Sequence, residues 1–395
     1  MQQMAPPCAS ITHQTQCGTR AKMNTKVPHG LHPDKSWRLS HDHGSTIQRS
    51  ARANNLRRPS VLYLSAHQGT AMDMAYVCHS LGVAFKWITP RLPYEVTKDA
   101  AADDWDRYGR DYQCGLFDYI IVADTNAKAR GLLENQCNDS QVVLHSTQRF
   151  DTGMEGQQKV EWLLLLEDKV RRMNNLHLIA NNPYEVWYAH QVRHAKFFRP
   201  RLIRPSGHWP TGDQLAHDVG DSKANAVVLQ QYLPYLNQIL LGNLSMQGIQ
   251  FQTLHHGKYG GAAGLAQYKC VIQFPYQVSV MAMYENLANG VALLVPSLQF
   301  YRSIARALLE NGVTLHLVDL DVLEQRPLGW TAIEWWAPYF SDVLVHFDSW
   351  DHLKQLVTAG DDFKTHKQQV IKFMDRHNTT VLQQWSDFLW CRLPC

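Results

Sequence analysis

The chain has 395 residues, a formal net charge of +3 and an apolar content of 45%. At roughly 100 to 200 residues per domain, this length predicts two domains, and the composition suffices for a core in each. The small charge, without a long basic run, argues against nucleic acid as a partner. No apolar window reaches the ~18 residues that a transmembrane segment needs.

Residues 1–58 differ in composition from everything that follows. Ser, Thr, Gln, His and Arg predominate, and Asp34 and Asp42 are the only acids. Such a segment buries too little apolar surface to fold, so we expect a disordered tail. Its basic, acid-poor character is also typical of an organelle transit peptide, which stays open as an alternative to a cytoplasmic protein.

The eight cysteines include no C-x-x-C pair. A disulfide framework or a zinc knuckle would need tighter, paired spacing. We therefore expect reduced thiols in a cytosol-like compartment, and no metal site.

From Pro59 onward, short apolar runs alternate with helical patterns. The runs at 61–67, 84–90, 117–125, 142–151 and 176–181 read as strands, and Gly82 is a stop signal for the helix at 70–82. Strands that alternate with helices in this way predict a parallel sheet covered on both faces.

A segment with three prolines, residues 197–214, reads as a linker. After it the alternation resumes, with further strands expected at 226–234, 249–256, 269–276, 292–297, 313–319 and 343–350, and a last long helix at about 362–390. The fold class predicted is therefore α/β, with two Rossmann-like domains facing a cleft. We place their boundaries at 59–205 and 206–361, followed by a C-terminal helix, 362–395, that would cross back to the first domain.

The stretch KCVIQFPYQVSVMAMYENLANGVALLVPS, residues 269–297, carries the main functional signal. An apolar strand leads through a polar turn to a helix with a single acid, Glu285. Ser279 is the expected N-cap, and the free N–H groups around Val280 and Met281 would favour a phosphate. Glu285, further along, could accept hydrogen bonds from ribose hydroxyls, or it could be an ordinary solvated helix residue.

This stretch resembles the donor-binding element of retaining glycosyltransferases of the GT-B fold. Glu285, Gly290 and Pro296 match the second acid, the glycine and the proline after the following strand, whereas Gln277 stands where the first acid would fall. The resemblance implies two Rossmann-like domains, a nucleotide-sugar donor bound to the second, an acceptor bound to the first, and no metal cofactor.

Two glycine-containing turns are further candidates. In HHGKYGGAAG, residues 255–264, Lys258 could neutralise a leaving diphosphate and Tyr259 could stack on a base, beside Gly260 and Gly261. The alternative is a plain turn between a strand and a helix.

The first strand of the chain ends at the second of these turns, His67-Gln68-Gly69. The helix after it is expected to begin at a Thr70 cap. Gly69 would allow close approach of the donor phosphates or the acceptor, and His67 could act as a base or simply be a hydrogen-bonded strand-end residue.

Other polar residues also end strands or lie near the domain crossing. Asp124, His145 and Asn181 could bind an acceptor or serve as caps, and Arg201 and Arg204 could neutralise phosphate or pack the linker.

The sequence thus predicts a glycosyltransferase that moves a sugar from a nucleotide-sugar donor to a glycan, protein or small-molecule acceptor. A non-catalytic protein that binds a sugar or nucleotide is the first alternative. A Rossmann-type oxidoreductase is the second, although the glycine fingerprint of a dinucleotide site is missing after the first strand.

Overall fold

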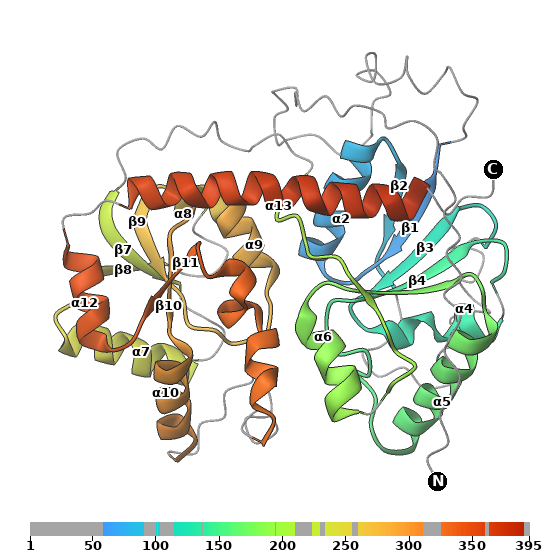
Figure 1. Ribbon diagram of the computed structural model, residues 1–395, viewed down its shortest axis with the longest axis horizontal. Helices are drawn as coiled ribbons and strands as arrows, with labels where there is room; N and C mark the ends of the chain where they lie inside the picture. Colours follow the sequence, from blue (N-terminus) through green and yellow to red (C-terminus); the bar gives the residue numbers. More distant parts are fainter. Residues whose placement is uncertain are drawn as a thin grey trace, which may run out of the picture.

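The structure is a computed structural model that describes residues 58–90, 100, 102, 114–135, 137–193, 195–209, 223–229, 234–254, 260–310, 325–359 and 363–390. Two parallel sheets lie side by side, and one long helix runs across both (Figure 1). The tail expected at 1–58 and the strand expected at 313–319 fall essentially outside the described residues.

The first sheet has the strand order β2-β1-β3-β4-β5-β6. Its strands are β1 Ser60–Leu64, β2 Ala84–Ile88, β3 Tyr119–Ala123, β4 Gln141–Ser146, β5 Leu176–Ala180 and β6 Arg201–Leu202. Its helices are α2 Gln68–Leu81, the 3-10 turn η2 Asn126–Ala129, α4 Arg130–Glu134, α5 Gly156–Arg172, α6 Pro183–Trp187 and the π-helical turn η3 Tyr188–Val192.

The second sheet has the order β11-β10-β9-β7-β8. Its strands are β7 Lys223–Leu229, β8 Phe251–Leu254, β9 Tyr268–Ile272, β10 Leu293–Pro296 and β11 Leu344–Phe347. Around it lie α7 Pro234–Met246, α8 Gly261–Ala266, α9 Met281–Ala288, α10 Leu298–Glu310, α12 Trp350–Thr358 and the 3-10 turns η4 Pro327–Ala332, η5 Glu334–Trp336 and η6 Pro338–Phe340.

Every strand pairing is parallel, and the central strands β3 and β9 are buried along their whole length. Strands buried on both faces are what near-continuous Val, Ile and Leu runs produce. The predicted α/β class with two Rossmann-like domains, the arrangement implied by the GT-B resemblance, is confirmed. In each sheet the first strand lies between the second and the third, so the strand order reverses direction there, and such switch points are where ligands bind in open α/β sheets.

The last helix, α13 Lys364–Trp390, packs on both sheets (Figure 1). At its start, the Lys367 ammonium donates to the carbonyls of Ala266 and Tyr268 in the second sheet. At its end, the buried residues Val381, Trp385, Phe388 and Leu389 belong to the same apolar cluster as alternate residues of β1, β3 and β4. The helix therefore supplies part of the first sheet's core.

Two local expectations were wrong. The predicted linker contains an edge strand, because Arg201 and Leu202 pair with Ile179 and Ala180 of β5 before the chain leaves the sheet. A disulfide joins Cys114 and Cys137, where reduced thiols were expected. The two cysteines are 23 residues apart in sequence, and tertiary folding around β3 brings their Cα atoms within 5.6 Å, which no spacing rule reveals.

The helix stop at Gly82 is as predicted. Gly82 adopts a left-handed conformation (φ +68°), and the N–H groups of Gly82 and Val83 donate to the last carbonyls of α2. Across the described part of the chain, no helix is both long and apolar enough to cross a bilayer.

Candidate functional site

The turn between β9 and α9 lies at the reversal point of the second sheet. Helix α9 begins at Met281, and its N-cap is Val280, whose side chain can make no capping hydrogen bond. The expectation that Ser279 caps the helix was wrong, because the N-cap position falls one residue later, at Val280. The N-cap side chain thus leaves the first-turn N–H groups of α9 uncapped within the described part of the chain, which suits an anion.

Glu285 lies on α9 and faces the linker and the first domain. One of its carboxylate oxygens accepts a hydrogen bond of 3.0 Å from the indole N–H of Trp209. Burial raises the pKa of Glu285, while the Trp209 hydrogen bond and the nearby His67 act in the opposite direction. Glu285 is therefore not a solvated outer-face residue.

The first domain brings His67 and Gly69 to the same place. Helices α2 and α9 are in contact, and a Cβ atom built on Gly69 would lie 3.3 Å from Cβ of Met281. A larger residue at this position would force the His67 ring or Met281 to shift by a few tenths of an ångström. The structure therefore brings His67, Gly69, Met281 and Glu285 together where α2 of the first domain packs against α9 of the second.

His67, not Thr70, is the N-cap of α2. Its ring Nδ1 accepts a hydrogen bond of 3.4 Å from the backbone N–H of Thr70. In a neutral imidazole whose Nδ1 is an acceptor, the proton is on Nε2. In this arrangement the exposed ring of His67 therefore presents its Nε2–H as a hydrogen-bond donor. To act as a base through Nδ1, His67 would first have to lose the hydrogen bond from the Thr70 amide.

The turn after β1 is occupied by the chain's own carboxylate. Asp124, in a left-handed conformation (φ +64°) at the end of β3, accepts hydrogen bonds from the N–H groups of Ala66 (3.0 Å) and His67 (3.1 Å). The hydroxyls of Ser65 and Thr147 donate to the same carboxylate. An anion cannot bind these amides, because Asp124 already does. The two sheets therefore differ at the point where their strand order reverses: the backbone N–H groups are occupied in the first sheet, whereas those at the start of α9 in the second sheet are uncapped.

Two other strand-end candidates have partners away from Glu285. His145 is buried beneath α13, where its Nδ1 contacts the Tyr63 hydroxyl at 3.2 Å and its ring packs edge-on against Trp385. Burial lowers the pKa of His145 to about 4. The buried Asn181 accepts a hydrogen bond of 2.7 Å from Asn182. Both residues serve the core.

The glycine-rich turn before α8 is only partly described. Lys258 and Tyr259 lie outside the described residues. Gly260 and Gly261 are both left-handed, with φ of +76° and +68°, and α8 contacts α9. The side chain of Gln277 is exposed, and the backbone carbonyl of Gln277 accepts a hydrogen bond from the Trp335 indole.

The linker contributes residues that sequence patterns missed. Ser206 Oγ and the Gly207 N–H donate to the buried Asp73 of α2, at 2.6 and 2.9 Å. Trp209 follows directly and reaches Glu285. The sequence offered one signal for this role, a tryptophan shortly after a Ser-Gly pair in a proline-rich segment. It could not show that Trp209 binds Glu285, which is 76 residues further along the chain.

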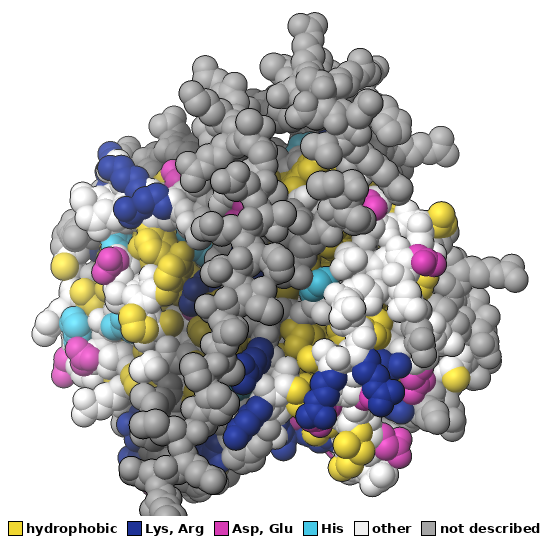
Figure 2. All heavy atoms as spheres, turned by 45° about the vertical axis from the view of Figure 1, so that its right-hand side comes forward, with side chains coloured by type: hydrophobic (Ala, Val, Ile, Leu, Met, Phe, Trp, Pro, Cys, Tyr) yellow, Lys and Arg dark blue, Asp and Glu magenta, His cyan; other side chains and the backbone are white. Residues whose placement is uncertain are grey.

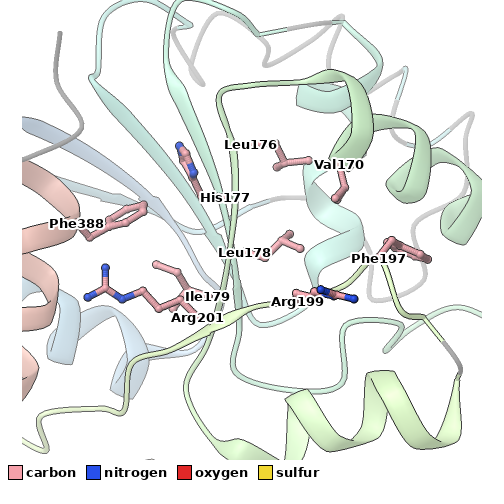
Figure 3. A pocket seen from close by; sticks show the side chains of 9 residues that line it. All are labelled: Val170, Leu176, His177, Leu178, Ile179, Phe197, Arg199, Arg201 and Phe388. Atoms are coloured by element: carbon pink, nitrogen blue, oxygen red, sulfur yellow. The ribbon is translucent and has the colours of Figure 1, made fainter. Parts of the chain in front are cut away.

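The two arginines of the linker region differ in role. Arg204 pairs with the fully buried Glu334 at 2.9 Å and lies over the Tyr339 ring, so it packs the linker. Arg201 lines a cavity of about 300 Å³ at the edge of β5, together with His177, Arg199, Phe197 and Phe388 (Figure 3). None of the residues that line this cavity belongs to the group around Glu285.

Among the described residues, no three His, Cys, Asp or Glu side chains lie close enough to hold a metal ion. On the face drawn in Figure 2, Lys and Arg side chains lie beside Asp and Glu side chains. The prediction that nucleic acid is not a partner stays a prediction.

The buried Glu185 of α6 gives a testable pH dependence. Burial raises its pKa to about 8, and neither carboxylate oxygen has a hydrogen-bond partner among the described residues. The folded protein then holds the proton more tightly than the unfolded chain. This stabilisation is full below pH about 4.5 and is lost as pH rises toward 8, at up to about 1.4 kcal/mol per pH unit.

We expect Glu185→Gln to flatten the fall in unfolding free energy between pH 5.5 and 7.5, measured by denaturant titration. The exposed Glu155→Gln is the control and should keep the wild-type slope. An unchanged slope in Glu185→Gln would show that Glu185 is already ionised at pH 5.5.

No protein-family model matches the sequence, and no curated protein does. Solved structures align over most of the chain at low identity. Sucrose-phosphate synthase from Thermosynechococcus elongatus is 11% identical, with 84% of this chain and 98% of that chain covered and a TM-score of 0.46. TcCGT1 in complex with UDP is 10% identical, with 84% and 99% covered and a TM-score of 0.43.

A UDP-N-acetylglucosamine 2-epimerase aligns similarly, at 11% identity, with 86% of this chain and 98% of that chain covered and a TM-score of 0.40. Similarities of this size assign neither an activity nor a ligand to the chain.

Proposed function

We propose that the protein is a glycosyltransferase that uses a nucleotide-sugar donor. The observation that carries this proposal is the position of Glu285: a partly buried carboxylate beyond the uncapped start of α9, at the second sheet's reversal point, facing the other domain. The first-turn N–H groups of α9 would hold the diphosphate, and Glu285 would accept hydrogen bonds from the ribose hydroxyls.

The acceptor would bind on the first domain, near the exposed His67. Its Nε2–H would orient an acceptor oxygen, and loss of the cap bond to Thr70 would free the ring to act as base. Stabilisation of the leaving diphosphate would come from backbone N–H groups and from Lys258, without a metal ion. A diphosphate at Met281 also requires that Gly69 move away, because the two now pack against each other.

A non-catalytic nucleotide-binding protein is the second candidate. It is favoured by Gln277, an exposed amide where the resemblance would place the first of two acids. The same site would then bind a donor without transferring its sugar. A dinucleotide oxidoreductase is disfavoured, because Asp124 occupies the amides of the turn after β1.

Nucleotide binding tests the proposal. We expect calorimetric titration to show binding of UDP or GDP in the absence of metal ions, and none of NAD. Glu285→Gln should weaken binding roughly 10- to 100-fold, because a carboxylate that accepts ligand hydrogen bonds contributes about 1.5–3 kcal/mol.

Glu161→Gln, a substitution on the outer helix α5, is the matched control and should bind like wild type. Equal affinity of Glu285→Gln and wild type would contradict the assigned ribose contact. Release of sugar from a nucleotide sugar, present in wild type and lost in Glu285→Gln, would separate the enzyme from the binding protein.

A further inference from the structure

The segment between the two sheets is fixed by buried partners. Its residues Ile203 and Pro205–His208 are buried. The anchoring hydrogen bonds are Arg204 Nε to Glu334 Oε1 (2.9 Å), His377 Nε2 to the Pro205 carbonyl (2.8 Å), and Ser206 Oγ and Gly207 N to Asp73 Oδ1 (2.6 and 2.9 Å). Breaking any of these would leave a buried polar group without its partner, at a cost of about 1–3 kcal/mol.

Trp209, at the end of this segment, is bound differently. Its side chain is 38% exposed, and its indole N–H reaches Glu285 at 3.0 Å. When this bond breaks, the indole N–H can be hydrated at once and Glu285 can take another donor. The Trp209–Glu285 bond is therefore easier to exchange than the buried anchors before it.

We infer that the indole N–H of Trp209 occupies the place on the Glu285 carboxylate that a ribose hydroxyl of the nucleotide sugar would take. Nucleotide binding then displaces the indole and releases Trp209, at the end of the linker, from α9. This inference rests on the proposed function. The indole donates one hydrogen bond, whereas a ribose diol can donate two to the same carboxylate, so the exchange favours the ligand.

The exchange would also loosen one connection between the two helices. Asp73 ties the segment 206–209 to α2, and Glu285 ties it to α9, so the two helices are linked through four residues. Loss of the Trp209–Glu285 bond removes this side-chain hydrogen bond to α9, whereas Gly207 stays packed against the Tyr284 backbone. The part that the exchange frees is therefore Trp209 at the end of the linker, and α9 stays in place.

Trp209→Phe tests the inference, because it removes the N–H and keeps an aromatic ring. We expect the variant to bind UDP roughly three- to tenfold more tightly than wild type, since one hydrogen bond no longer has to be broken. In a Glu285→Gln background the same substitution should change UDP affinity less than twofold. Trp336→Phe, which removes an indole bond of 3.0 Å to the Pro296 carbonyl, is the matched control and should not tighten binding.

Hydrogen exchange of peptides covering residues 204–209 gives a readout without ligand. Exchange in ligand-free Trp209→Phe should be faster than in wild type, and UDP should speed it in wild type only. If UDP binds wild type and Trp209→Phe equally, or if exchange is unchanged, Trp209 does not compete, and the proposed function stands. If no variant binds a nucleoside diphosphate, the inference and the proposed function both fail.

Discussion

Gly207→Ala is expected to lower the free energy of unfolding by roughly 2–5 kcal/mol, the sum of left-handed strain and overpacking. Gly207 has φ of +76°, and a Cβ atom there would lie 2.4 Å from the Tyr284 carbonyl oxygen and 2.6 Å from its carbon. These are backbone atoms of α9, so no side chain can rotate out of the way. The Gly207 N–H also holds Asp73, which limits movement on the other side.

Gly82→Ala separates the two contributions. Gly82 has a similar φ of +68°, but the nearest atom to its added Cβ is a guanidinium nitrogen of Arg58 at 3.5 Å, an ordinary contact. The loss there should be only about 1 kcal/mol. Denaturant titration followed by circular dichroism measures both. If Gly207→Ala and Gly82→Ala lowered the free energy of unfolding equally, α9 would have to shift away from the added methyl group. Its contact with the linker would then not be fixed.

Arg204→Met is expected to cost about 3–5 kcal/mol, because it leaves a buried charge without its partner. Glu334 is fully buried, and its Oε1 accepts hydrogen bonds from Arg204 and from the Tyr284 hydroxyl, both at 2.9 Å. Burial raises the pKa of Glu334, and Arg204 counteracts that rise. Without the guanidinium the pKa rises further, so the loss should shrink as pH falls toward the ordinary value for a glutamate.

The double variant Arg204→Met/Glu334→Leu should recover most of this loss, since a well-packed apolar pair can replace a buried ion pair. Arg171→Met is the control: it breaks the exposed pair with Glu167 and should cost less than about 1 kcal/mol. A double variant as unstable as Arg204→Met would assign the loss to packing on the Tyr339 ring, 4.3 Å from the guanidinium, rather than to the charge.

The fold could be predicted from the sequence because its signals are local. Buried parallel strands such as β3 and β9 are continuous apolar runs, and stop signals such as Gly82 act within one turn. The position of Glu285 followed from the same logic, because a helix after a parallel strand begins at the ligand-binding edge of the sheet.

The contacts that define the site are long-range, and the sequence could not supply them. Trp209 and Glu285 are 76 residues apart, and Asp124 reaches the amides of Ala66 and His67 from another strand. Ser279 and His67 show the same limit at shorter range. Both can cap a helix, but Val280 takes the N-cap position of α9, whereas His67 accepts a hydrogen bond from the Thr70 amide at the start of α2.

Helix α13 also constrains the order in which the protein can be completed during translation. Domains generally fold from the N-terminus as the chain emerges, but here the apolar face of β1, β3 and β4 is covered partly by α2 and partly by Val381, Trp385 and Phe388 of α13. Those residues are synthesised only after the entire second sheet. The nascent first sheet therefore keeps part of this apolar face uncovered until α13 arrives, so its core is complete only when almost the whole described chain has been synthesised.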